Sequence, residues 1–229
     1  MENPIFLALD VDTRERALEL ADQCGEFVGG FKIGPRLNLK YGHALTEELS
    51  QIRPVFVDNK FYDIPNTMAA SVQAVFDAGA SFCTIHAQAG PEALSRLAEL
   101  EKELCQNRPF KILAVTVLTS FNSDTLPSTQ IKASIPEQVE LLAKDVLESG
   151  LKGLVCSGEE ARRVRELSDE LVIVTPGIRP KGSDSNDQKR VLTPKEALEQ
   201  GSSYLVVGRP ILAADSPRQA AKAIFDSLS

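Results

Sequence analysis

Short runs of apolar residues alternate with amphipathic segments along the whole chain. The apolar runs predict eight strands, at residues 5–9, 30–33, 54–57, 81–86, 111–118, 151–156, 171–175 and 203–207. Helices are predicted at about 13–24, 34–51, 65–78, 91–104, 136–148, 159–167, from 194 and from 217, several of them opened by proline. Strands that are apolar throughout are typical of a parallel sheet covered on both faces.

Eight strand-then-helix units predict the fold class. In a chain of 229 residues they match an α/β protein of the (β/α)₈ barrel type. An open doubly wound sheet is the alternative, and it is disfavoured because no strand is followed by a G-x-G-x-x-G turn. Neither a linker nor a low-complexity tract interrupts the alternation. We therefore predict one domain over residues 1–229.

Composition narrows the functional classes. A net charge of -7 argues against a nucleic-acid-binding surface, and no apolar run is long enough for a membrane span. Four cysteines without C-x-x-C spacing and only two histidines make a zinc site a poor expectation. The start of the chain does not resemble a signal peptide. We expect a soluble cytoplasmic protein with reduced thiols.

One stretch places two carboxylates and an ammonium group just beyond a buried strand. Asp58 and Lys60 follow Val57, and Asp63 follows two residues of turn later, ahead of Pro65. Because strand side chains alternate, Asp58 and Lys60 are expected on one side, as in a proton-handling site. The other interpretation is that Asp63 caps the next helix and the pair is an ordinary ion pair. Alone, the motif favours that second interpretation.

Polar residues at the other strand ends favour the first. Asp10 ends the first strand, Lys32 lies in the second, and Thr119 ends the fifth. In a barrel these ends share one face, where active sites lie. Charges of alternating sign there, carried by Lys32, Asp58, Lys60 and Asp63, are expected to compensate one another in a network.

The loops after the last two strands predict a phosphate site. P-G-I-R-P at 176–180 and G-R-P at 208–210 occupy the place where this fold commonly binds phosphate. Gly208 permits close backbone approach, and Arg209 offers a forked donor. Two longer polar loops, 120–134 and 179–190, are candidate lids on the same face, the alternative being mobile surface loops.

These motifs together carry a family resemblance. A-L-D (8–10), F-K-I-G (31–34), F-V-D-N-K-F-Y-D-I-P-N-T (56–67), L-T-S (118–120), P-G-I-R-P and G-R-P occur in the expected order over nearly the whole chain. The chain resembles bacterial orotidine 5'-phosphate decarboxylases. D-x-K-x-x-D alone is shared with related barrels, whereas its continuation to Thr67 together with P-G-I-R-P is specific.

The resemblance implies decarboxylation of orotidine 5'-phosphate to uridine 5'-phosphate (UMP), with no cofactor and no metal. It implies that Lys60 protonates C6 of the pyrimidine after CO₂ leaves, and that Asp58 lies next to the substrate carboxylate. Lys32 joins the charged chain and, with Asp10, contacts the ribose. Thr119 lies near the pyrimidine.

The resemblance also implies residues for the phosphate and for a second subunit. Gln188 and Arg209 hold the phosphate, Gly208 lies beside it, and Arg179 supports it. Asp63 and Thr67 reach into the other subunit's site, which makes the enzyme a homodimer. Asn59 and Tyr62 depart from the family pattern, and His86 is interpreted as a hydrogen-bonded structural histidine.

Two other functions are weighed against this one. A Mg²⁺-dependent sugar-phosphate decarboxylase or aldolase of related fold would need an acidic residue near the end of the second strand, where this chain has Lys32. A catalytically inactive nucleotide-phosphate-binding barrel has no need to keep Asp58, Lys60 and Asp63 together, yet all are present.

Overall fold

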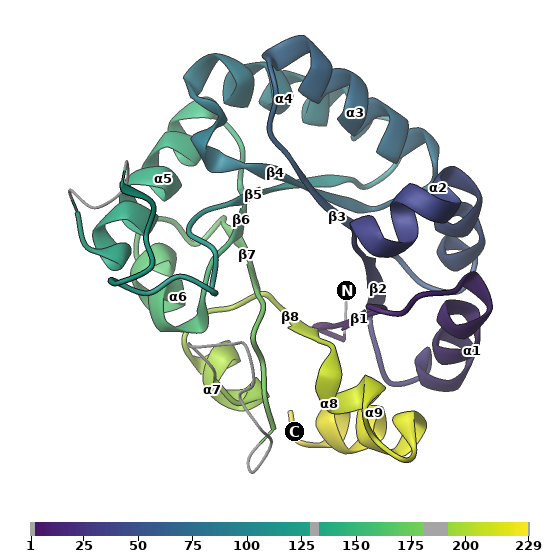
Figure 1. Cartoon of the computed structure of the whole chain (residues 1–229). Helices are drawn as coiled ribbons and strands as arrows, with labels where there is room; N and C mark the ends of the chain where they lie inside the picture. The colour runs from purple at the N-terminus through teal and green to yellow at the C-terminus, as the bar shows by residue number, and fades with distance from the viewer. Residues whose placement is uncertain (1–2, 129–132, 181–191, 229) are drawn as a thin grey trace.

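Eight parallel strands close into a barrel in the order in which they occur in the chain (Figure 1). The structure is a computed structural model that describes residues 3–128, 133–180 and 192–228. Its strands are β1 (Ile5–Ala8), β2 (Gly30–Ile33), β3 (Val55–Phe61), β4 (Phe82–His86), β5 (Lys111–Val115), β6 (Gly153–Val155), β7 (Val172–Thr175) and β8 (Tyr204–Val207). Closure comes from β8, which pairs with β1. The predicted (β/α)₈ fold is confirmed.

Helices surround the barrel and separate consecutive strands (Figure 1). They are α1 (Arg14–Cys24), α2 (Pro35–Ser50), α3 (Pro65–Asp77), α4 (Pro91–Leu104), α5 (Ile135–Ser149), α6 (Gly158–Arg165), α7 (Pro194–Glu199), α8 (Arg209–Leu212) and α9 (Pro217–Asp226), with a 3₁₀ turn, η1 (Ala87–Ala89). Capping boxes start two of them, through Ser134 with Glu137 and Thr193 with Glu196. The last helix, α9, packs against the first, α1, and so closes the ring of helices. No helix in the described ranges is long and apolar enough to cross a bilayer.

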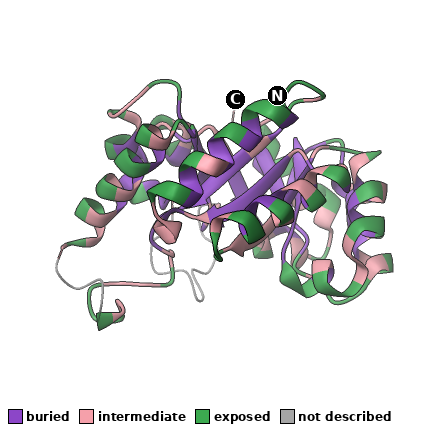
Figure 2. Ribbon diagram, turned by 90° about the horizontal axis from the view of Figure 1, so that it is seen from above, coloured by how far each residue is buried: buried purple, intermediate pink, exposed green. Residues whose placement is uncertain are grey.

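The strands are buried on both sides, as their apolar sequences predict. Figure 2 shows buried strands surrounded by helices whose exposed residues face outward. Outward-facing strand residues such as Leu7, Phe31 and Val57 pack into the layer between sheet and helices. Inward-facing residues form a second, smaller core inside the barrel.

Aromatic rings fill the amino-terminal half of the barrel interior. We call Phe6, Phe56, Phe82 and Tyr204 the aromatic plug. The Phe6 ring makes edge-on contacts with the other three, at centroid distances of 5.1 to 5.5 Å. A Cβ on Gly30 would lie 2.4 Å from Cε1 of Phe6, so only glycine leaves room for this ring. Because side chains alternate, the next inward positions along these strands lie at the carboxyl-terminal mouth.

Some elements differ from the sequence prediction. Strand β5 ends at Val115 rather than at 118, because the short β6 offers it no further partner beyond Val155. Strand β3 continues past 57 to Phe61. The short helix α8, immediately after the G-R-P glycine, was not predicted.

Candidate active site

A cavity of about 250 Å³ opens at the carboxyl-terminal mouth of the barrel. Its lining includes most of the site residues predicted from the sequence: Asp10, Lys32, Asp58, Lys60, Thr119, Arg179, Gly208 and Arg209. Apolar side chains form the rest of the wall, among them Phe56, Val155 and Val206. Residues from β1, β2, β3 and the loops after β5, β7 and β8 therefore converge on one chamber.

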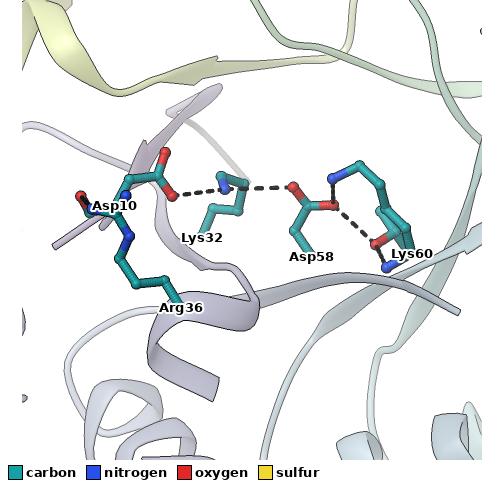
Figure 3. A network of polar contacts seen from close by, with 6 residues as sticks. Asp10, Lys32, Arg36, Asp58 and Lys60 are labelled. Carbon is teal, nitrogen blue, oxygen red and sulfur yellow. Dashed lines mark hydrogen bonds and ion pairs between the residues drawn. The ribbon is translucent and has the colours of Figure 1, made fainter. Parts of the chain in front are cut away.

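Four charged side chains of alternating sign form a continuous row along one wall (Figure 3). We call Asp10, Lys32, Asp58 and Lys60 the charged row. Lys32 Nζ lies 3.4 Å from Asp10 Oδ1 and 3.4 Å from Asp58 Oδ2. Lys60 Nζ donates to Asp58 Oδ1 at 2.8 Å. Each interior charge is thus flanked by opposite charges, but the predicted fourth member of the network, Asp63, forms no ion pair with Lys60 among the described residues, and Asp10 stands at the other end of the row instead.

Asp58 is the most enclosed carboxylate of the row, with only 14% of its side chain exposed. Burial by itself would raise the pKa of Asp58. The positive charges of Lys32 and Lys60, with hydrogen bonds from Lys60 and Thr84, outweigh burial and hold that pKa below its usual range. Asp58 is therefore ionised at neutral pH and keeps the Lys60 ammonium in place.

Lys60 does not have ordinary strand geometry. Its φ is 52°, and it is the single non-glycine residue with positive φ in the described part of the chain. The pairing of β3 with β4 shifts register between Val57 and Phe61. The sequence correctly predicted that Lys60 lies on the same side as Asp58, but strand alternation is not the cause. An irregularity in the strand turns the Lys60 side chain toward Asp58.

Thr84 is a site residue that sequence reasoning missed. It is fully buried on β4 between Phe82 and His86. Its hydroxyl accepts from Lys60 N at 2.9 Å and donates to Asp58 Oδ1 at 3.0 Å. A hydroxyl at an inward position of a strand beside the D-x-K motif was the available signal.

His86 lies half-buried at the end of β4, near Lys60. Its ring centroid is 5.7 Å from that of the exposed Tyr62. Burial, with the nearby Lys60 charge, lowers the pKa of His86, so its imidazole is neutral at pH 7. The His86 side chain has no hydrogen-bond partner among the described residues, so the expected hydrogen-bonded role is not supported.

The predicted phosphate end lies on the same cavity. Gly177, Arg179, Gly208 and Arg209 all line it. Arg179 is buried, its guanidinium donates to Ile178 O at 2.9 Å, and its backbone N donates to Leu192 O at 2.9 Å. Gln188 lies outside the described residues, as do all of the 179–190 loop from residue 181 onward and residues 129–132 of the other candidate lid.

Asp63 and Thr67 lie apart from the cavity. Both are exposed, Asp63 in the turn after β3 and Thr67 in the first turn of α3, and neither lines the chamber. Asp63 Oδ1 accepts from Ile64 N at 2.7 Å, and no ion pair joins it to Lys60 within the described chain. Ile64, not Asp63, is the N-cap of α3, so the helix-capping interpretation is wrong.

The arrangement can hold an anionic ligand and supply a proton to it. An ammonium group fixed by a carboxylate lies at one part of the chamber, and two arginines line another. Lys32 stands between two carboxylates, where its charge opposes a divalent cation. In the described ranges, no group of three or more His, Cys, Asp or Glu side chains is placed to hold a metal ion.

Comparisons with known proteins agree with these observations. The chain is 41% identical to an orotidine 5'-phosphate decarboxylase of Rhodospirillum rubrum, over 97% of this chain and 93% of that protein. It is likewise 41% identical to the enzyme of that name from Heliobacterium modesticaldum, over 98% and 95%. The crystal structure of orotidine 5'-phosphate decarboxylase from Lactobacillus acidophilus superposes with a TM-score of 0.85 at 33% identity, covering 100% of both chains. The family model for orotidine 5'-phosphate decarboxylase / HUMPS matches residues 3–224, and the chain belongs to this family.

Proposed function

We propose that Lys60 is the proton donor in the decarboxylation of orotidine 5'-phosphate to UMP, the carboxy-lyase reaction that its family membership supports. The observation that carries the proposal is the 2.8 Å contact between Lys60 Nζ and the buried, ionised Asp58 inside the cavity. This contact fixes a charged proton donor at one point of the chamber wall before substrate arrives.

The chemistry needs such a preorganised charge. When the bond from C6 to the carboxylate breaks, CO₂ leaves and the electron pair stays on C6. No adjacent π-system delocalises that pair, so it must be stabilised electrostatically. The Lys60 ammonium supplies the positive charge and then its proton, forming UMP. Asp58 lies next to the substrate carboxylate, and Lys32 balances its charge from the other side.

The remaining residues bind the nucleotide. Asp10 and Lys32 contact the ribose, at the end of the charged row. Thr119 lies near the pyrimidine, and its place on the cavity wall supports this role. The phosphate is held by Arg209 and Gln188 with Gly208 beside it and Arg179 in support. Binding energy from the phosphate, remote from C6, is available to organise the groups around C6.

The active unit is a homodimer in which Asp63 and Thr67 complete the partner's site. Two features support this part of the proposal. Asp63 and Thr67 are exposed and do not line their own cavity. Asp63 is flanked by two exposed apolar side chains, Tyr62 at 64% and Ile64 at 67% exposure, which would be covered by a second copy.

The free thiols of the chain suit a reducing compartment such as the cytoplasm.

Turnover of orotidine 5'-phosphate tests the reaction directly. Decarboxylation is followed by the change in ultraviolet absorbance, with and without EDTA. We expect turnover that EDTA does not alter, because Lys32 occupies the place where a Mg²⁺-dependent relative would need a carboxylate. Activity that depends on added Mg²⁺ would move the assignment to a sugar-phosphate enzyme of related fold.

Hybrid dimers test the shared sites. Lys60→Ala and Asp63→Asn chains are each expected to be inactive alone. When the two are mixed and allowed to exchange subunits, one site of each hybrid dimer has both residues intact. We expect activity to reappear on mixing, while a mixture of Lys60→Ala chains with Asp58→Asn chains stays inactive because both changes fall in the same chain's share of the site. No recovery in the first mixture would rule out sharing.

A further inference from the structure

We propose that Thr84 is a positioning residue that holds Asp58 and Lys60 in their reactive arrangement. The inference rests on the proposed function of Lys60 and extends it to a residue on a different strand. Thr84 is fully buried and lies beneath the pair, with its hydroxyl within hydrogen-bond distance of both residues.

The direction of the two hydrogen bonds is fixed by chemistry. A backbone amide can only donate, so the Thr84 hydroxyl accepts from Lys60 N. Its single proton is then left for Asp58 Oδ1, which must be an unprotonated acceptor. The same oxygen accepts from Lys60 Nζ. Thr84 therefore favours the ionised Asp58 and sets which of its oxygens faces Lys60.

The hydrogen bond from Lys60 N to the Thr84 hydroxyl gives a partner to a backbone amide that would otherwise lack one. Between Val57 and Phe61 the β3–β4 ladder loses register, so the Lys60 amide has no regular strand partner. Lys60 also has φ of 52°, which is uncommon for a residue with a side chain. The Thr84 oxygen satisfies this amide and so stabilises the conformation that directs the lysine toward Asp58.

A purely structural threonine is a natural control. Thr116 is also buried, near the end of β5, and its hydroxyl donates to Val155 O at 2.9 Å. It does not line the cavity, and its hydroxyl is hydrogen-bonded to a backbone carbonyl rather than to a member of the charged row. Thr116→Val removes a comparable buried hydroxyl without touching the reactive pair.

The experiment compares Thr84→Val, Thr84→Ser and Thr116→Val with the unmodified chain. Thr84→Val keeps the shape of the side chain but neither hydrogen bond. We expect its kcat to fall roughly 10- to 100-fold, as for the loss of hydrogen bonds to a charged group, with KM and UMP affinity within about threefold. Thr84→Ser should stay within about threefold of the unmodified chain, and so should Thr116→Val even if its Tm falls as much as that of Thr84→Val.

The pH profile gives a readout that general destabilisation would not move. The charged and titratable groups around Asp58 are Lys32 from β2, Lys60 from β3 and His86 from β4, and all are unchanged in these variants. Loss of the Thr84 donor removes one of the interactions that lower the pKa of Asp58. The acid limb of kcat/KM should therefore move to higher pH in Thr84→Val and stay in place in Thr84→Ser and Thr116→Val.

Two outcomes would overturn the proposal. One is a Thr84→Val enzyme with kcat within about threefold of normal and an unmoved acid limb. The other is an equal loss of kcat in Thr116→Val. If Thr84→Val does not fold, Thr84→Ala is measured against the same criteria. Lys60→Ala separates the two hypotheses: full turnover there refutes the proposed function, whereas an inactive Lys60→Ala beside a normal Thr84→Val refutes only the role of Thr84.

Discussion

The two ends of the barrel interior are built from the same strands but from opposite kinds of side chain. Phe56 and Asp58 are two residues apart on β3 and face the same interior. At the amino-terminal end, the aromatic plug consists of rings packed edge to face. At the carboxyl-terminal end, the charged row lines a cavity and stays partly open to solvent.

The aromatic plug at one end of the barrel interior stabilises the fold, whereas the charged row at the other end serves the chemistry. Burying the plug contributes directly to folding because its surface is apolar. The charged row contributes little net stability, since desolvation of its carboxylates and ammonium groups offsets their attraction. What the row supplies is a fixed electrostatic field inside the cavity. Changes at one end should therefore affect folding, and changes at the other should affect turnover.

The largest effect is expected from Lys60→Ala. Removing the proposed proton donor should lower kcat by at least about 10⁴-fold, the upper range for loss of a general acid. The free energy of unfolding should change by less than about 1 kcal/mol, because Asp58 keeps Lys32 as a partner and Lys60 is 35% exposed. Turnover assays and urea unfolding of the same preparation measure both. Near-normal turnover would remove Lys60 from the mechanism.

The next largest effect is expected at the opposite end. Phe6→Ala should reduce the free energy of unfolding by about 3 to 5 kcal/mol, the usual range for truncating a buried phenylalanine. Phe6 contacts all three other rings of the plug, so the gap cannot be filled by one neighbour. At a temperature where the variant is folded, kcat should remain within about threefold of normal. A much larger loss of kcat would show that the two ends are coupled.

A smaller effect is expected from Arg209→Ala, at the far side of the charged cavity. Loss of a forked donor to phosphate should lower kcat/KM for orotidine 5'-phosphate about 100-fold. The control is orotidine, which has the same pyrimidine and ribose but no phosphate. Its slow decarboxylation should be unaffected by the substitution. An equal loss with both substrates would place Arg209 away from the phosphate.

The smallest effect is expected from pH. The pKa of Asp58 is lower in the folded chain than in the unfolded one, so its contribution to stability is complete above the unfolded value, about 3.9. That contribution is lost as the pH falls through the folded pKa. Between pH 7 and 3 the unmodified chain should therefore lose more stability than Asp58→Asn, as measured by urea unfolding. Parallel curves for the two proteins would contradict the lowered pKa.

The sequence was sufficient for the strands and for most of the cavity wall. Continuous apolar runs predicted the parallel barrel, and polar residues at strand ends predicted which side chains line its mouth. This works because parallel strands in a closed barrel bring all their carboxyl ends to one face. Asp10, just after β1, Lys32 on β2 and Asp58 on β3 needed no more than that rule to be placed together.

What the sequence did not predict depends on contacts between strands. The shift in register at Lys60 arises from its pairing with β4, which no local pattern encodes. Thr84 acts through two residues more than twenty positions away. The early end of β5 follows from the length of β6 beside it. Asp63 lies only three residues after Lys60 in the sequence, yet it is exposed and does not line the cavity, so closeness in sequence was a poor guide there.

The positive φ of Lys60 lowers the stability of the fold at the residue that we propose as the proton donor. Glycine or asparagine adopts this backbone region more easily than lysine, which gives up on the order of 1 kcal/mol to remain there. A laboratory selection scored on heat resistance alone would therefore enrich Gly or Asn at position 60 and remove the proposed proton donor. Engineering this scaffold for thermostability requires that every round of selection also include a test of turnover.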